Sequence, residues 1–348
     1  MIEALTLGGG GAGSLGNNNA TGMLSADDFN DSTSTTLPLT FSKGYDAFYC
    51  MKYEISQGQY RDFLNTLTRD QQNKRTYTDV STDAITNTYV MADNSSMQNR
   101  NGIRCPSTGN GTTEPITFGC DYNGASTFDE VTDGQWIACN YLSWMDGCAY
   151  ADWAGLRPMT ELEFEKVCRG PVTPVADEYA WGTTDLTQAE GAVQNPGENN
   201  EVAATTGNGL ANYDGAGTDI SGPLRVGFAA ASATNRVSAG SGYYGNMNMS
   251  DNLWERAVTV GSSTGRVFIG TNGDGLLTTT ASNEGNATNS DWPGIDDTPT
   301  NGITGASGSG FRGGYWGISA GRLQVSLRTN AAYTSTSRSL SYGFRLVR

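Results

Sequence analysis

The carboxyl-terminal segment, Gly308 to Arg348, decides the fold of this chain and reads GSGFRGGYWGISAGRLQVSLRTNAAYTSTSRSLSYGFRLVR. This closing segment begins with an aromatic, glycine-rich stretch, FRGGYW at 311–316, and ends with GFRLVR at 343–348. The residues between these two framework stretches are mostly small, polar or aromatic, with no acidic residue and no lysine. We expect the function to reside in this segment, held on a rigid body that the preceding residues build.

The composition is that of a loop-rich chain with enough bulk for a core. Its 348 residues allow one large domain or two ordinary ones. Only 37% of the residues are hydrophobic, while glycine, serine, threonine and asparagine are abundant, which favours a loop-rich α+β or all-β body. The seven tryptophans and sixteen tyrosines supply the large side chains that a hydrophobic core needs.

The charge is divided unevenly along the chain. The closing segment carries six arginines and no acid, whereas the whole chain has a net charge of −15, so the preceding residues carry −21. Such an acidic body repels the phosphates of nucleic acid, and we expect no nucleic-acid partner. We expect Arg312, Arg328 and Arg345 to pair inward with acids of the body, because a guanidinium suits bidentate contact with a carboxylate.

Histidine is absent, which excludes a Ser-His-Asp triad, a Cys-His pair and a histidine-ligated zinc or iron. The six cysteines lack the C-x-x-C spacing of a zinc site. Cys105 and Cys120 bracket a polar loop and are candidates for a disulfide, while the pairing of the other four stays open. The acidic composition and the scarcity of lysine favour an extracellular, cell-surface or virion location.

No signal peptide and no long apolar run is recognisable in the sequence. We therefore expect no membrane insertion, and we interpret the chain as a mature form or as a part of something longer. Residues 1–40 are rich in glycine, asparagine, serine and threonine, too polar for a core of their own. We predict a flexible arm there that becomes ordered only against the body or a neighbouring subunit, which makes an oligomer through residues 1–40 possible.

Residues 41–348 are predicted to form a single domain with a polar insertion at 70–130, made of surface loops and short strands. The stretch Phe48–Tyr53 (FYCMKY) predicts a strand, and Ser56 is placed to cap a helix at Gln57–Leu67. Apolar residues recur in this helix at spacings of three and four, so one face is expected to be buried.

Two further helices are predicted in the middle of the chain. One spans Gln135–Trp153, where tryptophan, cysteine, leucine and tyrosine side chains are available to a core. The other spans Glu161–Val167, because Thr160 and Glu163 have the spacing of a capping box.

Six stretches, in this order, resemble the sulfatase-modifying, formylglycine-generating-enzyme-like family, and together they are highly specific. They span 44–348 approximately and are YEISQGQYRDFLN (53–65), YLSWMDGCAYADWAGLRPMTELEFEKVCRG (141–170), YAWG (179–182), NLWE (252–255), FRGGYW (311–316) and YGFRLVR (342–348). The resemblance implies an α+β, C-type-lectin-like fold with long loop insertions. It also implies that 308–348 crosses the exposed face where ligands of this fold dock.

Membership of this family does not by itself give an activity. The copper-dependent oxidases of the family carry two cysteines just after the Gly-Gly, at positions that match Ile318 and Leu323 here. Copper(I) needs soft thiolates, which isoleucine and leucine cannot replace. The iron-dependent relatives that join sulfur to histidine derivatives use histidine ligands, and this chain has none. We therefore expect no copper, no iron and no enzyme activity, but a binding scaffold.

The resemblance also implies a structural calcium ion near the Asn-x-Trp-Glu motif. The matching donors are the side chains of Asn248 and Glu255 and the backbone carbonyls of Asp251 and Leu253. Oxygen donors on a loop suit a hard cation such as Ca²⁺. The alternative is that Glu255 pairs with an arginine of the closing segment.

The closing segment has the composition of an adaptable binding surface, with rigid aromatic anchors among small hydrogen-bonding groups. Leucines among polar neighbours also suggest a surface that is covered by a ligand. The predicted ligand-contact residues are Tyr315, Gly317, Ile318, Ser319, Arg322, Gln324, Ser326, Leu327, Thr329, Asn330, Tyr333, Ser335, Ser337, Ser339, Leu340 and Tyr342.

A subset of the family serves as the variable protein of diversity-generating retroelements, in which the closing segment is rewritten between fixed framework residues. This segment resembles such a product, so our first hypothesis is a non-catalytic receptor-binding or adhesive module. A structural subunit of an extracellular or virion assembly and a divergent enzyme are the alternatives. Sugar-selective lectins of this fold show short calcium-ligating motifs that we do not find, so we expect a protein ligand rather than a glycan.

Overall fold

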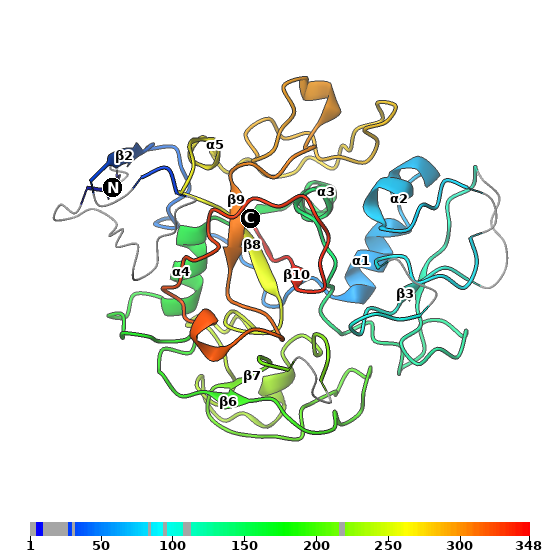
Figure 1. Cartoon of the computed structure of the whole chain (residues 1–348), viewed down its shortest axis with the longest axis horizontal. Helices are drawn as coiled ribbons and strands as arrows, with labels where there is room; N and C mark the ends of the chain where they lie inside the picture. Colours follow the sequence, from blue (N-terminus) through cyan, green and yellow to red (C-terminus); the bar gives the residue numbers. More distant parts are fainter. Residues whose placement is uncertain are drawn as a thin grey trace.

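The structure is a computed structural model that describes residues 5–9, 27–29, 32–82, 85–92, 96–106, 113–215 and 220–348 (Figure 1). It is an α+β fold in which short elements are joined by long loops. The α-helices are α1 Gln57–Leu64, α2 Arg69–Arg75, α3 Trp144–Trp153, α4 Glu161–Arg169 and α5 Ser263–Arg266. The strands are β1 Leu5–Gly8, β2 Ser34–Leu37, β3 Ile103–Arg104, β4 Gly119–Cys120, β5 Arg157–Pro158, β6 Thr187–Gln188, β7 Leu210–Ala211, β8 Trp254–Val258, β9 Ser309–Arg312, β10 Tyr342–Gly343 and β11 Leu346–Val347.

Three strands that lie near the middle of the molecule organise the fold (Figure 1). Strand β8 is fully buried and pairs antiparallel with β9, in a register that sets Glu255 opposite Arg312. On its other edge β8 pairs parallel with β10, which sets Tyr342 opposite Trp254. Both framework stretches of the closing segment are therefore hydrogen-bonded to the strand that carries the Asn-x-Trp-Glu motif.

The carboxyl terminus is tied to the segment that was predicted as a strand at Phe48–Tyr53. Strand β11 pairs antiparallel with β5, and its residue Val347 also bridges to Cys50. The amide N–H of Tyr49 donates to the carbonyl of Arg348 at 2.8 Å, and that of Met51 donates to the carbonyl of Leu346 at 3.0 Å. The segment is extended, as expected, but its ladder with the chain end is a single bridge.

Two helices start at the residues predicted to cap them, Ser56 as an N-cap and Thr160 with Glu163 as a capping box. Ser56 and Gln59 cap α1, and Thr160 and Glu163 cap α4, each with both reciprocal hydrogen bonds present. Helix α1 ends at Leu64, three residues before the predicted end. Helix α4 continues to Arg169 and stops at Gly170, whose φ of 63° lies in the left-handed region that glycine tolerates.

The helix predicted at Gln135–Trp153 is wrong over its first half. Helix α3 begins only at Trp144, because the Ser143 side chain caps it and the Asp146 carboxylate closes the capping box. The residues before it are held by bridges, Ser56 with Ala138 among them. Their apolar side chains reach the core from turns, so hydrophobic spacing alone misled the prediction.

The insertion at 70–130 is more than a set of surface loops. It contains most of α2 together with β3 and β4, which pair with each other, and it buries side chains such as Val80, Ile116 and Phe118 in the largest apolar cluster. The disulfide expected between Cys105 and Cys120 is not formed, and all six cysteines are free thiols. The register of β3 and β4 sets Ile103, and not Cys105, opposite Cys120.

Parts of the predicted arm lie on the body. Strands β1 and β2 pair antiparallel, and Leu7, Phe29 and Leu37 are buried in the main apolar cluster. Most of the glycine-rich stretch, residues 10–26, lies outside the described residues. Among the residues that are described, no helix is long and apolar enough to cross a membrane.

The packing of α3 against the closing segment gives a testable contact. Phe344 is fully buried, its ring lies 5.4 Å from that of Trp144, and a Cβ added at Gly147 would overlap it. We expect Gly147→Ala to lower stability by about 1–3 kcal/mol despite the better helix propensity of alanine. Chemical unfolding measures this loss. Gly321→Ala is the matched control, because nothing lies near its added Cβ; equal stability of the two variants would contradict the packing argument.

Candidate functional site

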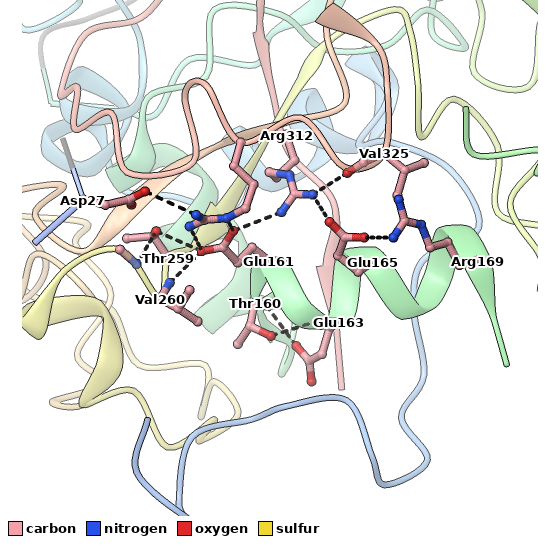
Figure 2. A network of polar contacts seen from close by, with 12 residues as sticks. Asp27, Thr160, Glu161, Glu163, Glu165, Arg169, Thr259, Val260, Arg312 and Val325 are labelled. Atoms are coloured by element: carbon pink, nitrogen blue, oxygen red, sulfur yellow. Dashed lines mark hydrogen bonds and ion pairs between the residues drawn. The ribbon is translucent and has the colours of Figure 1, made fainter. Parts of the chain in front are cut away.

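The closing segment is held down by a buried carboxylate at the start of α4. The Glu161 carboxylate accepts from Arg312 Nη1 at 3.0 Å and from Arg328 Nε and Nη2 at 2.6 and 2.8 Å (Figure 2). It also accepts from the amide N–H of Val260 at 2.7 Å and from the Thr259 hydroxyl at 3.0 Å. The segment is thus fixed at its first framework stretch and again at Arg328.

The neighbouring charges complete this network. Arg312 also contacts Glu165 and donates to the carbonyl of Val325 at 2.5 Å, while Arg328 lies 3.2 Å from Asp27 (Figure 2). Acidic side chains in the first turn of α4 also match the partial positive charge of a helix amino terminus. Burial alone would raise the pKa of the Glu161 carboxyl, but Arg328 and Arg312 outweigh it and lower this pKa to about 2.

The second framework stretch is fixed by another buried pair. Arg345 Nε donates to Glu255 Oε1 at 2.7 Å, and both side chains are inaccessible to solvent. The other nitrogens of Arg345 donate to the carbonyls of Met51 and Met247 at 3.0 and 2.5 Å. The prediction that Arg312, Arg328 and Arg345 pair inward is therefore confirmed.

Aromatic rings bury the remaining framework residues. Trp316 packs with Ala138, Val226 and Leu253, and its Nε1 donates to the carbonyl of Leu340 at 3.2 Å. The Phe311 ring lies 4.4 Å from that of Tyr342. These contacts thus attach the backbone of the closing segment to the core of the protein.

The sixteen predicted ligand-contact residues all retain solvent exposure. Tyr333 has 53% of its surface exposed, and Ser319, Arg322, Ser326 and Ser337 are exposed as well. The other eleven are half-buried, and none is fully buried. All sixteen residues thus keep some exposed surface along 315–342, although Tyr315, Ile318 and Leu340 also pack against buried clusters.

A buried arginine, Arg256, packs against framework rings of the closing segment and was not predicted from the sequence. The guanidinium of Arg256, on β8, lies over the rings of Phe311, Tyr342 and Trp144 at 4.5, 5.6 and 5.7 Å. Its Nη2 donates to the carbonyl of Ser335 at 2.6 Å. Burial lowers the pKa of Arg256 to about 10. The one signal in the sequence that could have pointed to Arg256 is its place two residues after Trp254, on the same face of a buried strand.

The positions that match the copper-binding cysteines of the family are apolar in their surroundings as well as in identity. Leu323 is fully buried in a cluster with Met159, Phe164 and Met249. Ile318 is half-buried against the same cluster. Hydrocarbon side chains thus fill the place where thiolates would be needed.

Three of the four predicted calcium donors, Asn248, Asp251 and Leu253, lie in one buried loop, and the fourth, Glu255, lies on β8. The Oδ1 of Asn248 accepts from the amide N–H of Gly227 at 2.7 Å, and its Nδ2 donates to Asp251 at 3.1 Å. Leu253 is fully buried beside Glu255. The Oε2 of Glu255 is buried without a hydrogen-bond partner, although its Oε1 is bound by Arg345. A cation or a proton on Oε2 would satisfy this oxygen. The structure shows the alternative expected from the sequence, in which Glu255 pairs with an arginine of the closing segment, Arg345.

A third carboxylate, Glu54, was not predicted to take part here. It accepts from the amide N–H of Leu253 at 3.1 Å and from Asn252 Nδ2 at 2.7 Å. Burial raises the pKa of Glu54 well above its ordinary value, raises that of Asp251 to about 7, and also raises that of Glu255. In the described part of the chain no group of three or more acidic or cysteine side chains is arranged to hold a metal.

The Glu161 network predicts an acid-sensitive contribution to stability. A carboxyl with an ordinary pKa of 4.5 when unfolded and about 2 when folded stabilises the fold above pH 4.5. This contribution is lost as the pH falls towards 2, and its full size is on the order of 3 kcal/mol. We expect urea unfolding to show that Glu161→Gln is destabilised near pH 7 and that the difference from wild type shrinks in acid.

Glu165→Gln is the matched control, because Glu165 is partly exposed and shares Arg312 with Glu161. Glu165→Gln should lose less stability than Glu161→Gln at every pH. A difference between wild type and Glu161→Gln that stays constant from neutral pH to pH 2 would contradict the assignment.

Comparisons with known proteins place the chain in a family. No curated protein matches the chain. PvdO from Pseudomonas aeruginosa is a similar solved structure, with 14% identity, a TM-score of 0.41, and coverage of 99% of this chain and 93% of that one. The model of the sulfatase-modifying factor enzyme 1-like domain matches residues 16–348. The chain therefore belongs to the sulfatase-modifying factor, formylglycine-generating-enzyme-like family, which includes both catalytic and non-catalytic members.

Proposed function

We propose that this protein is a non-catalytic binding domain whose closing segment forms the contact surface for a protein ligand. One observation carries the proposal: the sixteen predicted contact residues all keep solvent exposure, while the framework residues beside them are buried. Such a division separates the residues that hold the fold from those that are free to meet a partner.

The anchoring of the segment supports binding on physical grounds. Glu161 and Glu255 fix the arginines of the framework, so the backbone that presents Tyr315, Tyr333 and Tyr342 is ordered before a ligand arrives. A preformed surface loses less conformational entropy on binding. Tyrosine and serine then supply contact area and adaptable hydrogen bonds.

The lack of an activity is part of the proposal. Ile318 and Leu323 offer no thiolate to copper, and the absence of histidine removes the ligands of the iron-dependent relatives. Neither copper nor iron is therefore proposed for this chain.

The finer proposal is that the closing segment is diversified. Buried framework stretches on both sides of an exposed, loop-like run allow many side chains to change without loss of the fold. This is the arrangement that a diversity-generating retroelement requires of its variable protein. A position outside the cell or on a virion remains a prediction from composition.

Calcium is proposed as a structural ion at Asn248, Asp251, Leu253 and Glu255. We expect Ca²⁺ to raise the melting temperature of wild type, because it would neutralise the unpaired Oε2 of Glu255. Glu255→Gln should remove this response, which differential scanning fluorimetry with Ca²⁺ and Mg²⁺ measures. An unchanged melting temperature across a calcium titration of chelator-treated protein would leave a proton as the occupant of Oε2.

Sequencing the gene across its source population tests the diversified binder directly. We expect substitutions at the codons of the sixteen contact residues, with the codons for Phe311, Trp316 and Phe344 unchanged. An unvaried segment, or changes spread evenly over the framework, would contradict diversification.

A pair of variants checks the division of roles in the protein itself. Trp316→Ala should cost about 3–5 kcal/mol, because it empties a buried site. Tyr333→Ala should leave the melting temperature nearly unchanged, because half of its surface is already exposed. If Tyr333→Ala melted the fold, its assignment to the contact surface would be wrong.

A further inference from the structure

A second surface, separate from the closing segment, lies along residues 48–53, which are extended as far as Met51 and bend at Lys52 and Tyr53. One edge of this segment pairs with the chain end, through Tyr49 and Met51. Cys50 lies between them, and its amide N–H and carbonyl have no hydrogen-bond partner among the described residues. On the same edge the carbonyl of Lys52 accepts from the amide N–H of Met247 at 2.8 Å, so the unpaired part of the edge lies at Cys50. An unpaired backbone amide and carbonyl offer hydrogen bonds that another extended chain can use.

Two cavities open beside this segment, and Lys52 lines both of them. The first, about 480 Å³, is lined by Phe48, Tyr49, Lys166 and Tyr244 among others. The second, about 500 Å³, is lined by residues that include Tyr53, Trp136 and Arg225. We call the two cavities together the strand-edge groove. None of the sixteen predicted ligand-contact residues lines it.

The charge of the groove is opposite to that of the protein. The chain has a net charge of −15 and only four lysines, yet Lys52 and Lys166 both line the groove, and Arg225 joins them. No aspartate or glutamate lines either cavity. A cationic, acid-free hollow on an acidic protein attracts an anionic ligand and repels a cationic one.

The walls of the groove expose large aromatic rings. Tyr49 has 84% of its surface exposed, Tyr244 57% and Trp136 47%. Aromatic side chains are the residue types that most often anchor protein partners, especially beside cations. Rings exposed to this extent contribute little to the fold, so they are available to a ligand.

We propose that the strand-edge groove binds an extended, acidic peptide segment of a partner protein. The backbone of this segment would pair with the free edge at Cys50, in the manner of an added strand. Its acidic side chains would meet Lys52 and Lys166, and its apolar side chains would lie against Tyr49 and Tyr244. The unpaired backbone edge favours a peptide over an acidic glycan, because a glycan lacks the regular alternation of amide donors and carbonyl acceptors.

Panning a phage-displayed library of random short peptides against the full chain tests this proposal. Wild type should enrich sequences rich in aspartate and glutamate. Lys52→Glu should lower the affinity of the enriched peptides by about tenfold or more, as measured by fluorescence anisotropy. The affinity of wild type for these peptides should fall as the salt concentration is raised. Lys74→Glu is the matched control, because Lys74 lies on α2 and lines neither cavity. Tyr49→Ala should weaken binding, whereas Tyr77→Ala, another exposed tyrosine, should not.

N-methylation of alternate amides in an enriched peptide tests the strand pairing, and it should abolish binding. The proposal is overturned if no acidic sequences are enriched. It is also overturned if Lys74→Glu lowers the affinity of the enriched peptides as much as Lys52→Glu does. Binding of an acidic oligosaccharide such as oligoguluronate, lost in Lys52→Glu while no acidic peptide binds, would also overturn it in favour of a glycan.

Discussion

The structure depends on a carboxylate that is buried between two arginines. Glu161 sits at the start of α4 and binds Arg312 from the first framework stretch and Arg328 from the middle of the closing segment. A buried ion pair of this kind contributes little net stability as a whole. Removing one partner nevertheless leaves the other charges buried and uncompensated in a medium of low polarity, which destabilises the fold. Its main effect is therefore geometric, since the observed path of the closing segment brings both guanidinium groups within hydrogen-bond distance of Glu161.

This geometric control matters because the segment has little regular structure of its own. Between β9 and β10 the structure assigns only a short 3₁₀ helix, Ala320–Arg322. A helix or a strand would dictate which side chains face outward and would restrict their identity through propensity. A run of turns anchored by Glu161, Glu255 and the ring of Trp316 places no such demand on the residues between the anchors. The exposed side chains of the closing segment can therefore differ in identity while its backbone keeps the same fold.

Local signals in the sequence were the easiest to interpret. The N-cap at Ser56 and the capping box of Thr160 and Glu163 depend only on residues close in the sequence, and both formed. The inward pairing of the framework arginines followed from the contrast between a cationic segment and an acidic body. The start of α3 at Trp144 did not follow from apolar spacing, because turns deliver the same side chains to the core. Glu54 and Arg256 could not be assigned, since their partners lie far away in the sequence.

The two surfaces of the molecule are linked through Arg345. Its guanidinium binds Glu255, which lies on β8 opposite Arg312, and it also binds the carbonyl of Met51, which lies in the segment that borders the strand-edge groove. The carboxylate of Glu255 binds this guanidinium directly, so a change in its charge acts on Arg345. A loss of that charge would loosen the contact surface and the groove together, because one buried side chain holds the backbone beneath both.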